Sequence, residues 1–267
     1  MGEVSGEVKG FKPLSPEQKF RPKSLDFAEK LRLLYKKPNV EGRENLPQGA
    51  CVIATTHLSG FDVPEVYAEI TKDRKAGISM QESILTHPLF KLAANLIGKD
   101  NLFPLSNRNS SILRDEDLEK MKRALVEDGR TLVVAAHNPT KDWELPDRPG
   151  LTPIILAHQA KVPLVPVALD IQTRIPVRER VISAVKSALR HRPESKIIVG
   201  NPILFPEIPE EKLQLVINLF STEKRRLMTE EQIQEAQVTL NVLKSEAGEV
   251  MKALASNLPA EKRGKWG

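Results

Sequence analysis

His57 and Asp62 stand five residues apart in a segment that could form a catalytic pair. An imidazole titrates near neutral pH, so it can take a proton from a hydroxyl group and return it to a leaving group within one catalytic cycle. A carboxylate that holds the other ring nitrogen fixes the tautomer that this requires. The spacing therefore predicts a general base, His57, and a carboxylate, Asp62, that orients it. Spacing alone leaves an alternative open, because a histidine after a strand is more often a structural residue with satisfied hydrogen bonds.

The remaining thiol and imidazole groups indicate little further chemistry. Cys51 is the one cysteine of the chain, which rules out an internal disulfide and favours a reducing compartment. It lies in an apolar run, where we expect it to pack as a small hydrophobic residue. The histidines at 87, 158 and 191 have no carboxylate at comparable spacing and are predicted to be structural or exposed. Since no cluster has the ligand spacing of a zinc site, we expect no metal, and we expect no cofactor.

The segments around the pair alternate between strand and helix patterns. Apolar runs predict strands at 50–55, 77–80, 101–105, 131–136, 164–170 and 196–199. Helical patterns occupy 63–72, 83–97, 115–128, 152–159 and 178–190. This alternation predicts an α/β fold with a mostly parallel central sheet flanked by helices. His57 would then lie in the loop after the first core strand.

Helical patterns also dominate both ends of the chain. We predict a helical lead-in over 1–49, an α/β core over 50–205 and a C-terminal helical segment over 206–267 that packs on the core. Thr229 and Gln232 have the spacing of a capping box at the start of a long helix. The polar, basic tail at 259–267 is expected to be frayed.

The composition limits the class of protein. The 267 residues are 40% hydrophobic and 28% charged, as is ordinary for a soluble globular protein. The N-terminus lacks the pattern of a secretory signal, and no stretch approaches about 20 apolar residues, so we expect a cytoplasmic protein. A net charge of +5 fits contact with phosphates or an anionic membrane surface. With only 4% aromatic residues for stacking and no recognised motif, nucleic acid is not an expected partner.

Three blocks together resemble the glycerolipid acyltransferase family, which includes 1-acylglycerol-3-phosphate and glycerol-3-phosphate acyltransferases. The family's NHxSxxD motif is matched by Thr56-His57-Leu58-Ser59-Gly60-Phe61-Asp62, with Thr56 in place of Asn. A hydrophobic block with prolines is matched at 162–169, and 196–203 looks like the strand with glycine and proline that follows it. The resemblance covers roughly residues 50–203. It implies the family's fold, a catalytic role for His57 and Asp62 within a His-X4-Asp motif, and a place for Ser59 in the substrate-binding site.

Two further blocks depart from the family pattern. The family's second block ends in an arginine, for which Arg108 is a loose counterpart, either an anion ligand or a solvated side chain. The third block is usually Phe-Pro-Glu-Gly-Thr-Arg-Ser and binds the acceptor headgroup, whereas this chain has Ala135-Ala136-His137-Asn138-Pro139-Thr140-Lys141. The aligned candidates for acceptor binding are His137, Asn138, Thr140 and Lys141. His137 either contacts an altered acceptor or is a loop residue that hydrogen-bonds the backbone, and the acceptor can differ from glycerol 3-phosphate.

The resemblance implies transfer of a fatty acyl group, without an acyl-enzyme, in phospholipid biosynthesis. The donor would be acyl-CoA or acyl carrier protein, and the acceptor a hydroxyl of a glycerolipid precursor or a related polyol phosphate. Two alternatives stay open: a hydrolase that uses His57 and Asp62 on water, and a lipid or thioester binder without catalysis.

A basic run from Arg174 to Lys196 overlies an apolar helical face at 178–190. This pattern predicts peripheral attachment to an anionic membrane, at its inner face. A solvated charged face is the alternative.

Overall fold

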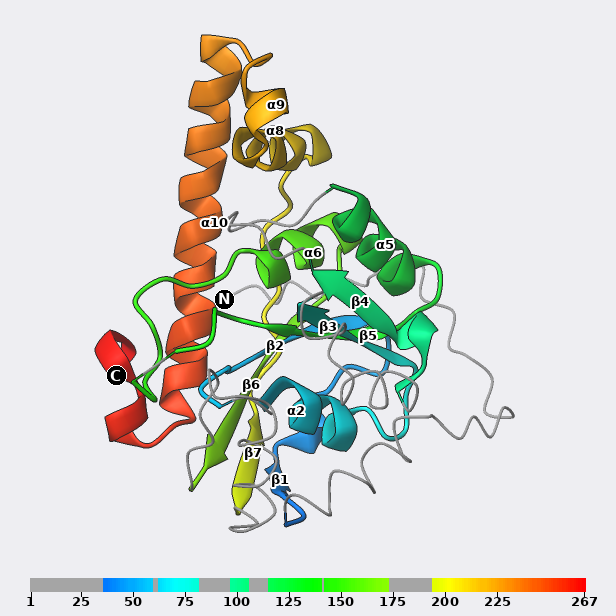
Figure 1. The fold of residues 1–267 in the computed structure, drawn as a ribbon, viewed down its shortest axis with the longest axis vertical. Helices are drawn as coiled ribbons and strands as arrows, with labels where there is room; N and C mark the ends of the chain where they lie inside the picture. Colours follow the sequence, from blue (N-terminus) through cyan, green and yellow to red (C-terminus); the bar gives the residue numbers. More distant parts are fainter. Residues whose placement is uncertain (1–35, 60–61, 82–96, 106–114, 141, 173–193) are drawn as a thin grey trace, which may run out of the picture.

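The computed structural model describes residues 36–59, 62–81, 97–105, 115–140, 142–172 and 194–267, and seven strands within them form one sheet (Figure 1). The sheet order is β1-β7-β6-β2-β5-β3-β4. Five neighbouring strands run parallel: β6 (Leu164–Ile171), β2 (Cys51–Thr55), β5 (Thr131–Ala135), β3 (Ala76–Gln81) and β4 (Leu102–Leu105). Strand β7 (Ser195–Val199) runs antiparallel to β6. The predicted α/β fold with a mostly parallel sheet is confirmed.

Strand β2 lies at the centre of the parallel part, and all five of its residues are buried. Uninterrupted apolar runs are typical of strands that are covered on both faces. Val52 and Ala54 pack into one hydrophobic cluster, and Cys51 and Ile53 into the other. The six strands predicted from such runs each agree with an observed strand to within one residue at either end.

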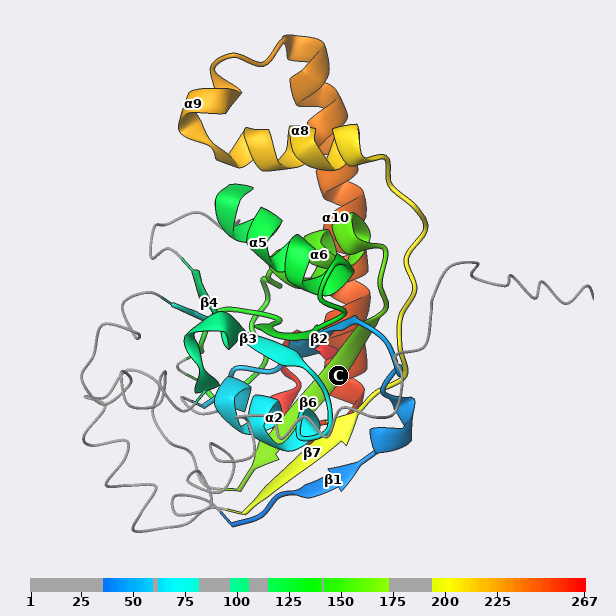
Figure 2. The same ribbon diagram turned by 90° about the vertical axis from the view of Figure 1, so that its right-hand side faces the viewer.

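Helices cover both faces of this sheet (Figure 2). One face carries α5 (Asp115–Val126), α6 (Thr152–Ala160) and α10 (Glu230–Ser256), whereas α2 (Asp62–Ile70) lies on the other. Helix α8 (Glu210–Phe220) packs against α10 and α6. The helices predicted at 83–97 and 178–190 fall outside the described residues, apart from position 97. Of the helices that are described, none combines the length and the apolar character that crossing a membrane requires.

The described part of the N-terminal lead-in contains no α-helix, so that part of the prediction is wrong. Residues 36–49 contain the edge strand β1 (Asn39–Glu41), parallel to β7, and the short 3-10 helix η1 (Arg43–Asn45). Gly42 makes the turn between them with φ 72°, and a Cβ there would lie 2.3 Å from the Val199 carbonyl oxygen. Only glycine fits this close approach without strain. The rest of the predicted lead-in, residues 1–35, lies outside the described residues.

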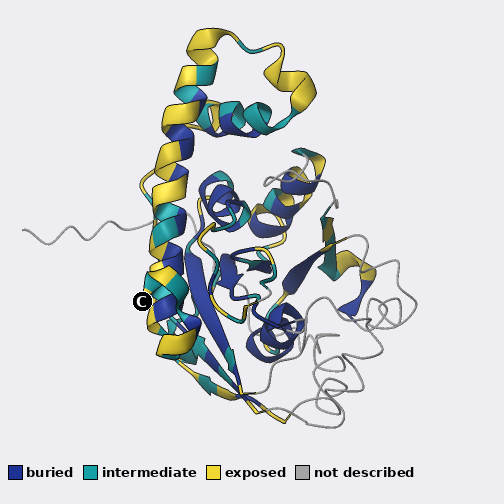
Figure 3. Ribbon diagram, turned by 60° about the vertical axis from the view of Figure 1, so that its left-hand side comes forward, coloured by how far each residue is buried: buried dark blue, intermediate teal, exposed yellow. Residues whose placement is uncertain are grey.

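Helix α10 begins at the predicted capping box. The Thr229 hydroxyl accepts from the Gln232 backbone N–H (3.2 Å), and the Gln232 side chain accepts from the Thr229 N–H (3.0 Å). One stripe of the helix is buried and the opposite stripe is exposed (Figure 3). With α8 and the short helix α9 (Thr222–Arg225), its N-terminal part forms an arm that extends beyond the sheet (Figure 1).

The tail after α10 is packed, and the expectation of a frayed end is wrong. Residues 260–266 form the 3-10 helices η3 (Ala260–Lys262) and η4 (Gly264–Trp266). The Trp266 indole Nε1 donates to the Pro146 carbonyl (2.9 Å), and the Leu145 N–H donates to the Lys262 carbonyl (2.9 Å). These bonds fasten the C-terminus to the loop after β5.

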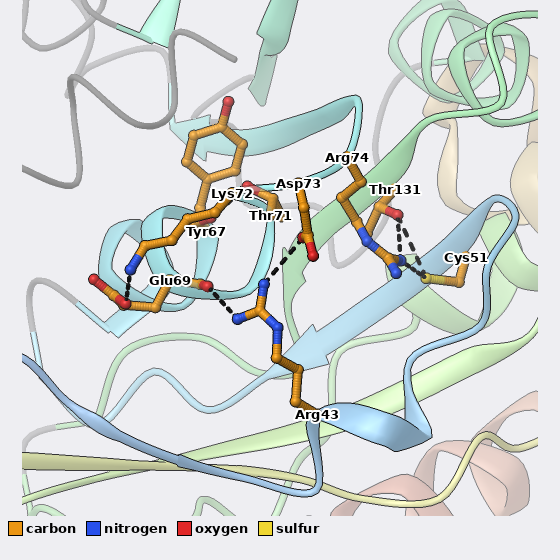
Figure 4. Close-up of polar contacts among 9 residues, drawn as sticks. All are labelled: Arg43, Cys51, Tyr67, Glu69, Thr71, Lys72, Asp73, Arg74 and Thr131. Carbon is orange, nitrogen blue, oxygen red and sulfur yellow. Dashed lines mark hydrogen bonds and ion pairs between the residues drawn. The ribbon is translucent and has the colours of Figure 1, made fainter. Parts of the chain in front are cut away.

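Polar contacts fix the end of α2 and the loop after it to three other elements (Figure 4). Arg43 donates to the Glu69 carbonyl and pairs with Asp73, both at 3.0 Å. Arg74 donates to the Thr131 hydroxyl at 3.1 Å and contacts the Cys51 thiol at 3.8 Å. The thiol is fully buried, and burial raises its pKa, so Cys51 packs as a small hydrophobic residue as predicted. A fixed α2 holds Asp62 in place at its other end.

Candidate active site

The carboxyl ends of β2, β5 and β6 bring three chemically active segments to one edge of the sheet. Thr55, at the end of β2, pairs with Ala135 of β5 and with Val167 of β6. The residues that follow are therefore neighbours, although they are far apart in the sequence. In open α/β sheets, ligands bind at this edge. His57 and His137 both lie there, as does the end of β6.

His57 presents one free ring nitrogen. Its Nδ1 lies 3.1 Å from the Ser59 carbonyl oxygen, which can only accept, so Nδ1 carries the proton and Nε2 carries the lone pair. No hydrogen bond to Nε2 comes from any residue that the structure describes. Burial lowers the pKa of His57 below its usual 6.5, against an opposing effect of the Ser59 carbonyl. At neutral pH the ring is therefore uncharged and has a lone pair available to accept a proton.

Asp62 does not bind the imidazole, which corrects the expected contact. Its Oδ2 accepts from the backbone N–H groups of Leu58 (2.6 Å) and Ser59 (2.9 Å). The loop between β2 and α2 is so short that it folds back over the first turn of α2, where the carboxylate meets the loop's own N–H groups. The Ser59 carbonyl orients the ring, and Asp62 binds the N–H of the same residue, which belongs to the preceding peptide group.

The Asp62 carboxyl group is buried in an unfavourable environment. Burial raises its pKa well above the usual range, and nearby Glu65 adds to this, while the two N–H groups and the Lys262 ammonium act in the opposite direction. Asp62 Oδ1 and the Ser59 hydroxyl are both buried, with no hydrogen-bond partner among the described residues. Buried polar atoms of this kind are uncommon in native structures and often mark functional positions.

His137 holds the backbone of the catalytic loop. Its Nε2 accepts from the His57 backbone N–H (3.1 Å), and its Nδ1 donates to the Asn138 carbonyl (2.8 Å). The residue is 3% exposed, and burial lowers its pKa to about 4, so the ring stays neutral. Both ring nitrogens are therefore occupied by backbone groups. Of the two interpretations of His137, this geometry supports the loop residue that hydrogen-bonds the backbone and not the contact with the acceptor.

The structure assigns no specific role to the other predicted site residues. Asn138 is exposed, and Thr140 is half-buried with its hydroxyl unpaired among the described residues. Arg108 and Lys141 lie outside the described residues, so their roles stay predictions. Thr56, which replaces the family's asparagine, accepts from the Leu169 N–H (3.0 Å) and ties β2 to β6.

Sequence reasoning missed a cation at this edge. Lys262, only 6% exposed, pairs with Asp170, donates to the Ile171 carbonyl (2.8 Å) and lies 4.4 Å from the ring centroid of Trp143. A cavity of about 380 Å³ adjoins it, lined by Asp142, Trp143, Asp170, Gln172, Pro259, Glu261 and Lys262. A lysine in a polar tail gives no sequence signal for this role, whereas Trp143, two residues after the third block, could have indicated the site.

Titratable groups elsewhere do not form a second centre in the part of the chain that the structure describes. No group of three or more His, Cys, Asp or Glu side chains there could hold a metal ion. His158 is buried, with its Nε2 2.7 Å from Glu246 of α10, which agrees with the predicted structural role.

Comparison with known proteins supports the fold. The structure is similar to the crystal structure of the 1-acyl-sn-glycerophosphate acyltransferase PlsC from Thermotoga maritima, with a TM-score of 0.50 and 15% sequence identity. The match covers 85% of this chain and 78% of that chain. No protein-family model matches the sequence, and no curated protein sequence matches it.

Proposed function

We propose that this protein is an acyltransferase that moves a fatty acyl group from an acyl thioester to a hydroxyl group of a lipid precursor. The observation that carries the proposal is the state of His57 at the carboxyl edge of a parallel sheet: the Ser59 carbonyl engages Nδ1, and no described residue hydrogen-bonds Nε2. The fold shared with PlsC and the His-X4-Asp resemblance support it.

The reaction uses Nε2 of His57 twice. Nε2 takes the proton from the acceptor hydroxyl as its oxygen bonds to the thioester carbonyl carbon. The tetrahedral intermediate then collapses, the carbon–sulfur bond breaks, and the imidazolium returns the proton to the leaving thiolate. The catalytic loop contributes no obvious stabilisation of the oxyanion, because the N–H groups of residues 56–59 are all engaged within the protein. These donors instead fix the loop, which contributes by holding the base in position.

The natural donor, in this proposal, is acyl-CoA or acyl carrier protein, and the acceptor a glycerolipid precursor or a related molecule of phospholipid biosynthesis. The family resemblance supports this choice. We also propose that the enzyme is cytoplasmic and attaches to the inner membrane face through the basic run at 174–196.

Product analysis separates this function from its alternatives. The purified protein is incubated with an acyl-CoA, with and without a panel of lysolipid and polyol acceptors, and the lipids are analysed by mass spectrometry. An acylated product that requires the acceptor and His57 supports transfer. Free fatty acid at the same rate without acceptor indicates a hydrolase, and bound thioester without turnover indicates a binder without catalysis.

A further inference from the structure

The cavity beside Lys262 lies next to the proposed base. Asp170 follows Leu169, whose N–H bonds to Thr56, the residue directly before His57. The Lys262 ammonium is also close enough to lower the pKa of the Asp62 carboxyl group. The cavity is therefore linked to the loop that carries His57 through Lys262 and Asp62.

The cavity offers acceptors of hydrogen bonds and no available cation among its described lining residues. Three carboxylates line it, from Asp142, Asp170 and Glu261. Its one cation, Lys262, is already engaged by Asp170, the Ile171 carbonyl and the face of Trp143. Asp142 and Glu261 form no ion pair with any other described residue and lie exposed at the rim. Carboxylates only accept hydrogen bonds, so they suit hydroxyl donors and repel a phosphate.

Trp143 provides a flat wall beside these acceptors. Its backbone φ of 60° is unusual for a residue other than glycine, and such conformations persist where the surroundings enforce them. The Lys262 ammonium lies over the indole ring and holds it at the cavity. An aromatic face with carboxylates and the Gln172 amide around it matches the mixed apolar and hydroxyl surface of a polyol.

We propose that this cavity is the acceptor site and that it takes an uncharged, hydroxyl-rich headgroup in place of a phosphorylated one. This inference rests on the acyl transfer proposed above and names the class of acceptor for it. The inference also accounts for the altered third block. Within that block His137 holds the loop that carries His57, and the residues that follow the block, Asp142 and Trp143, line the headgroup site.

The test compares two soluble acceptors that differ only in the phosphate, 1-butanoylglycerol and 1-butanoylglycerol 3-phosphate, with one acyl-CoA donor. We expect kcat/KM of the full-length protein to favour the uncharged acceptor by at least about tenfold. In Asp142→Asn/Glu261→Gln that preference should fall through a raised KM for the uncharged acceptor. The matched control, Glu144→Gln/Asp147→Asn, changes two exposed carboxylates of the same loop outside the cavity and should keep the preference.

Calorimetric binding of 1-butanoylglycerol without donor separates this inference from the proposed function. If the protein binds 1-butanoylglycerol, the Asp142→Asn/Glu261→Gln variant binds it more weakly and no transfer is seen, the acceptor site is supported and the proposed function is refuted. Transfer that favours the phosphorylated acceptor, or a preference that the variant leaves unchanged, would refute the site and leave the function standing.

Discussion

The tautomer of His57 is set by a backbone carbonyl and not by a side chain. The Ser59 carbonyl accepts from Nδ1, and Asp62 binds the peptide N–H of the same Ser59. Asp62 and the imidazole thus bind the two backbone groups of residue 59, the N–H and the carbonyl, which belong to successive peptide groups. The link between Asp62 and the ring is therefore indirect.

The pH dependence of transfer should report the lowered pKa of His57. A base must be neutral to act, and burial disfavours the imidazolium, so activity should persist below the pH at which a solvated histidine becomes protonated. We expect the acidic limb of kcat/KM to have its midpoint below pH 6.5 when transfer is measured from about pH 4.5 to 8. A midpoint above 6.5 would contradict the buried environment of His57.

Two substitutions at Asp62 should separate its hydrogen bonds from its charge. In Asp62→Asn the amide oxygen can still accept from Leu58 and Ser59, and no charge needs to be buried, so the melting temperature should change little. Asp62→Ala leaves both donors unpaired, which costs roughly 1–3 kcal/mol for each buried group. Chemical denaturation of both variants measures the difference. Equal stability would show that the two N–H groups do not depend on the carboxylate.

At the level of elements, α2 is held against β7 through a buried carboxyl group. The Ser195 hydroxyl donates to Glu65, which is 3% exposed. Burial, with nearby Glu69, raises the pKa of Glu65 to about 7. In the unfolded chain it titrates near 4.3. The folded state therefore loses stability as pH rises from about 4.3 through 7, because ionisation favours the unfolded chain.

Glu65→Gln removes that loss and keeps an acceptor for Ser195. We expect the variant to match the wild type in melting temperature near pH 4.5 and to exceed it at pH 8, as measured by calorimetry. The control Glu249→Gln, on α10, loses an exposed ion pair with Lys252 and should gain nothing at pH 8. A Glu65→Gln variant that is less stable than the wild type at pH 8 would contradict this account of α2.

The elements were predictable to very different degrees, for physical reasons. The central strands are buried on both faces, so their apolar runs determine them locally, and the Thr229 to Gln232 capping box is a local signal too. Strand β1 has three residues and exists because β7 pairs with it, which no local pattern reveals. His57 and Asp62 were predicted as neighbours, yet their hydrogen bonds depend on how the short loop folds. The position of Lys262 depends on contacts of the C-terminal tail with residues far away in the sequence, such as Leu145 and Asp170, which no local pattern reveals.

For the whole molecule, the excess of positive charge and the basic run at 174–196 predict that the protein acts at a membrane surface. Each Lys or Arg near an anionic surface contributes about 1 kcal/mol, and this attraction is screened within about 10 Å at 0.1 M salt. Sedimentation with anionic vesicles should recover the protein at low salt, less at high salt and little with neutral vesicles. Charge reversal at Arg178, Arg190 and Arg192 should abolish it, and equal binding of that variant would refute the membrane role.

The proposed reaction depends on one atom, Nε2 of His57, so replacing this side chain is the most direct test. The measurement is kcat/KM for acyl transfer from acyl-CoA to a hydroxyl acceptor by wild type, His57→Gln and the control His158→Gln, which changes a buried histidine on α6. We predict that His57→Gln loses roughly 10² to 10⁴-fold while its melting curve and the activity of His158→Gln stay close to wild type. Transfer by His57→Gln within twofold of wild type would contradict a role for His57 as the base.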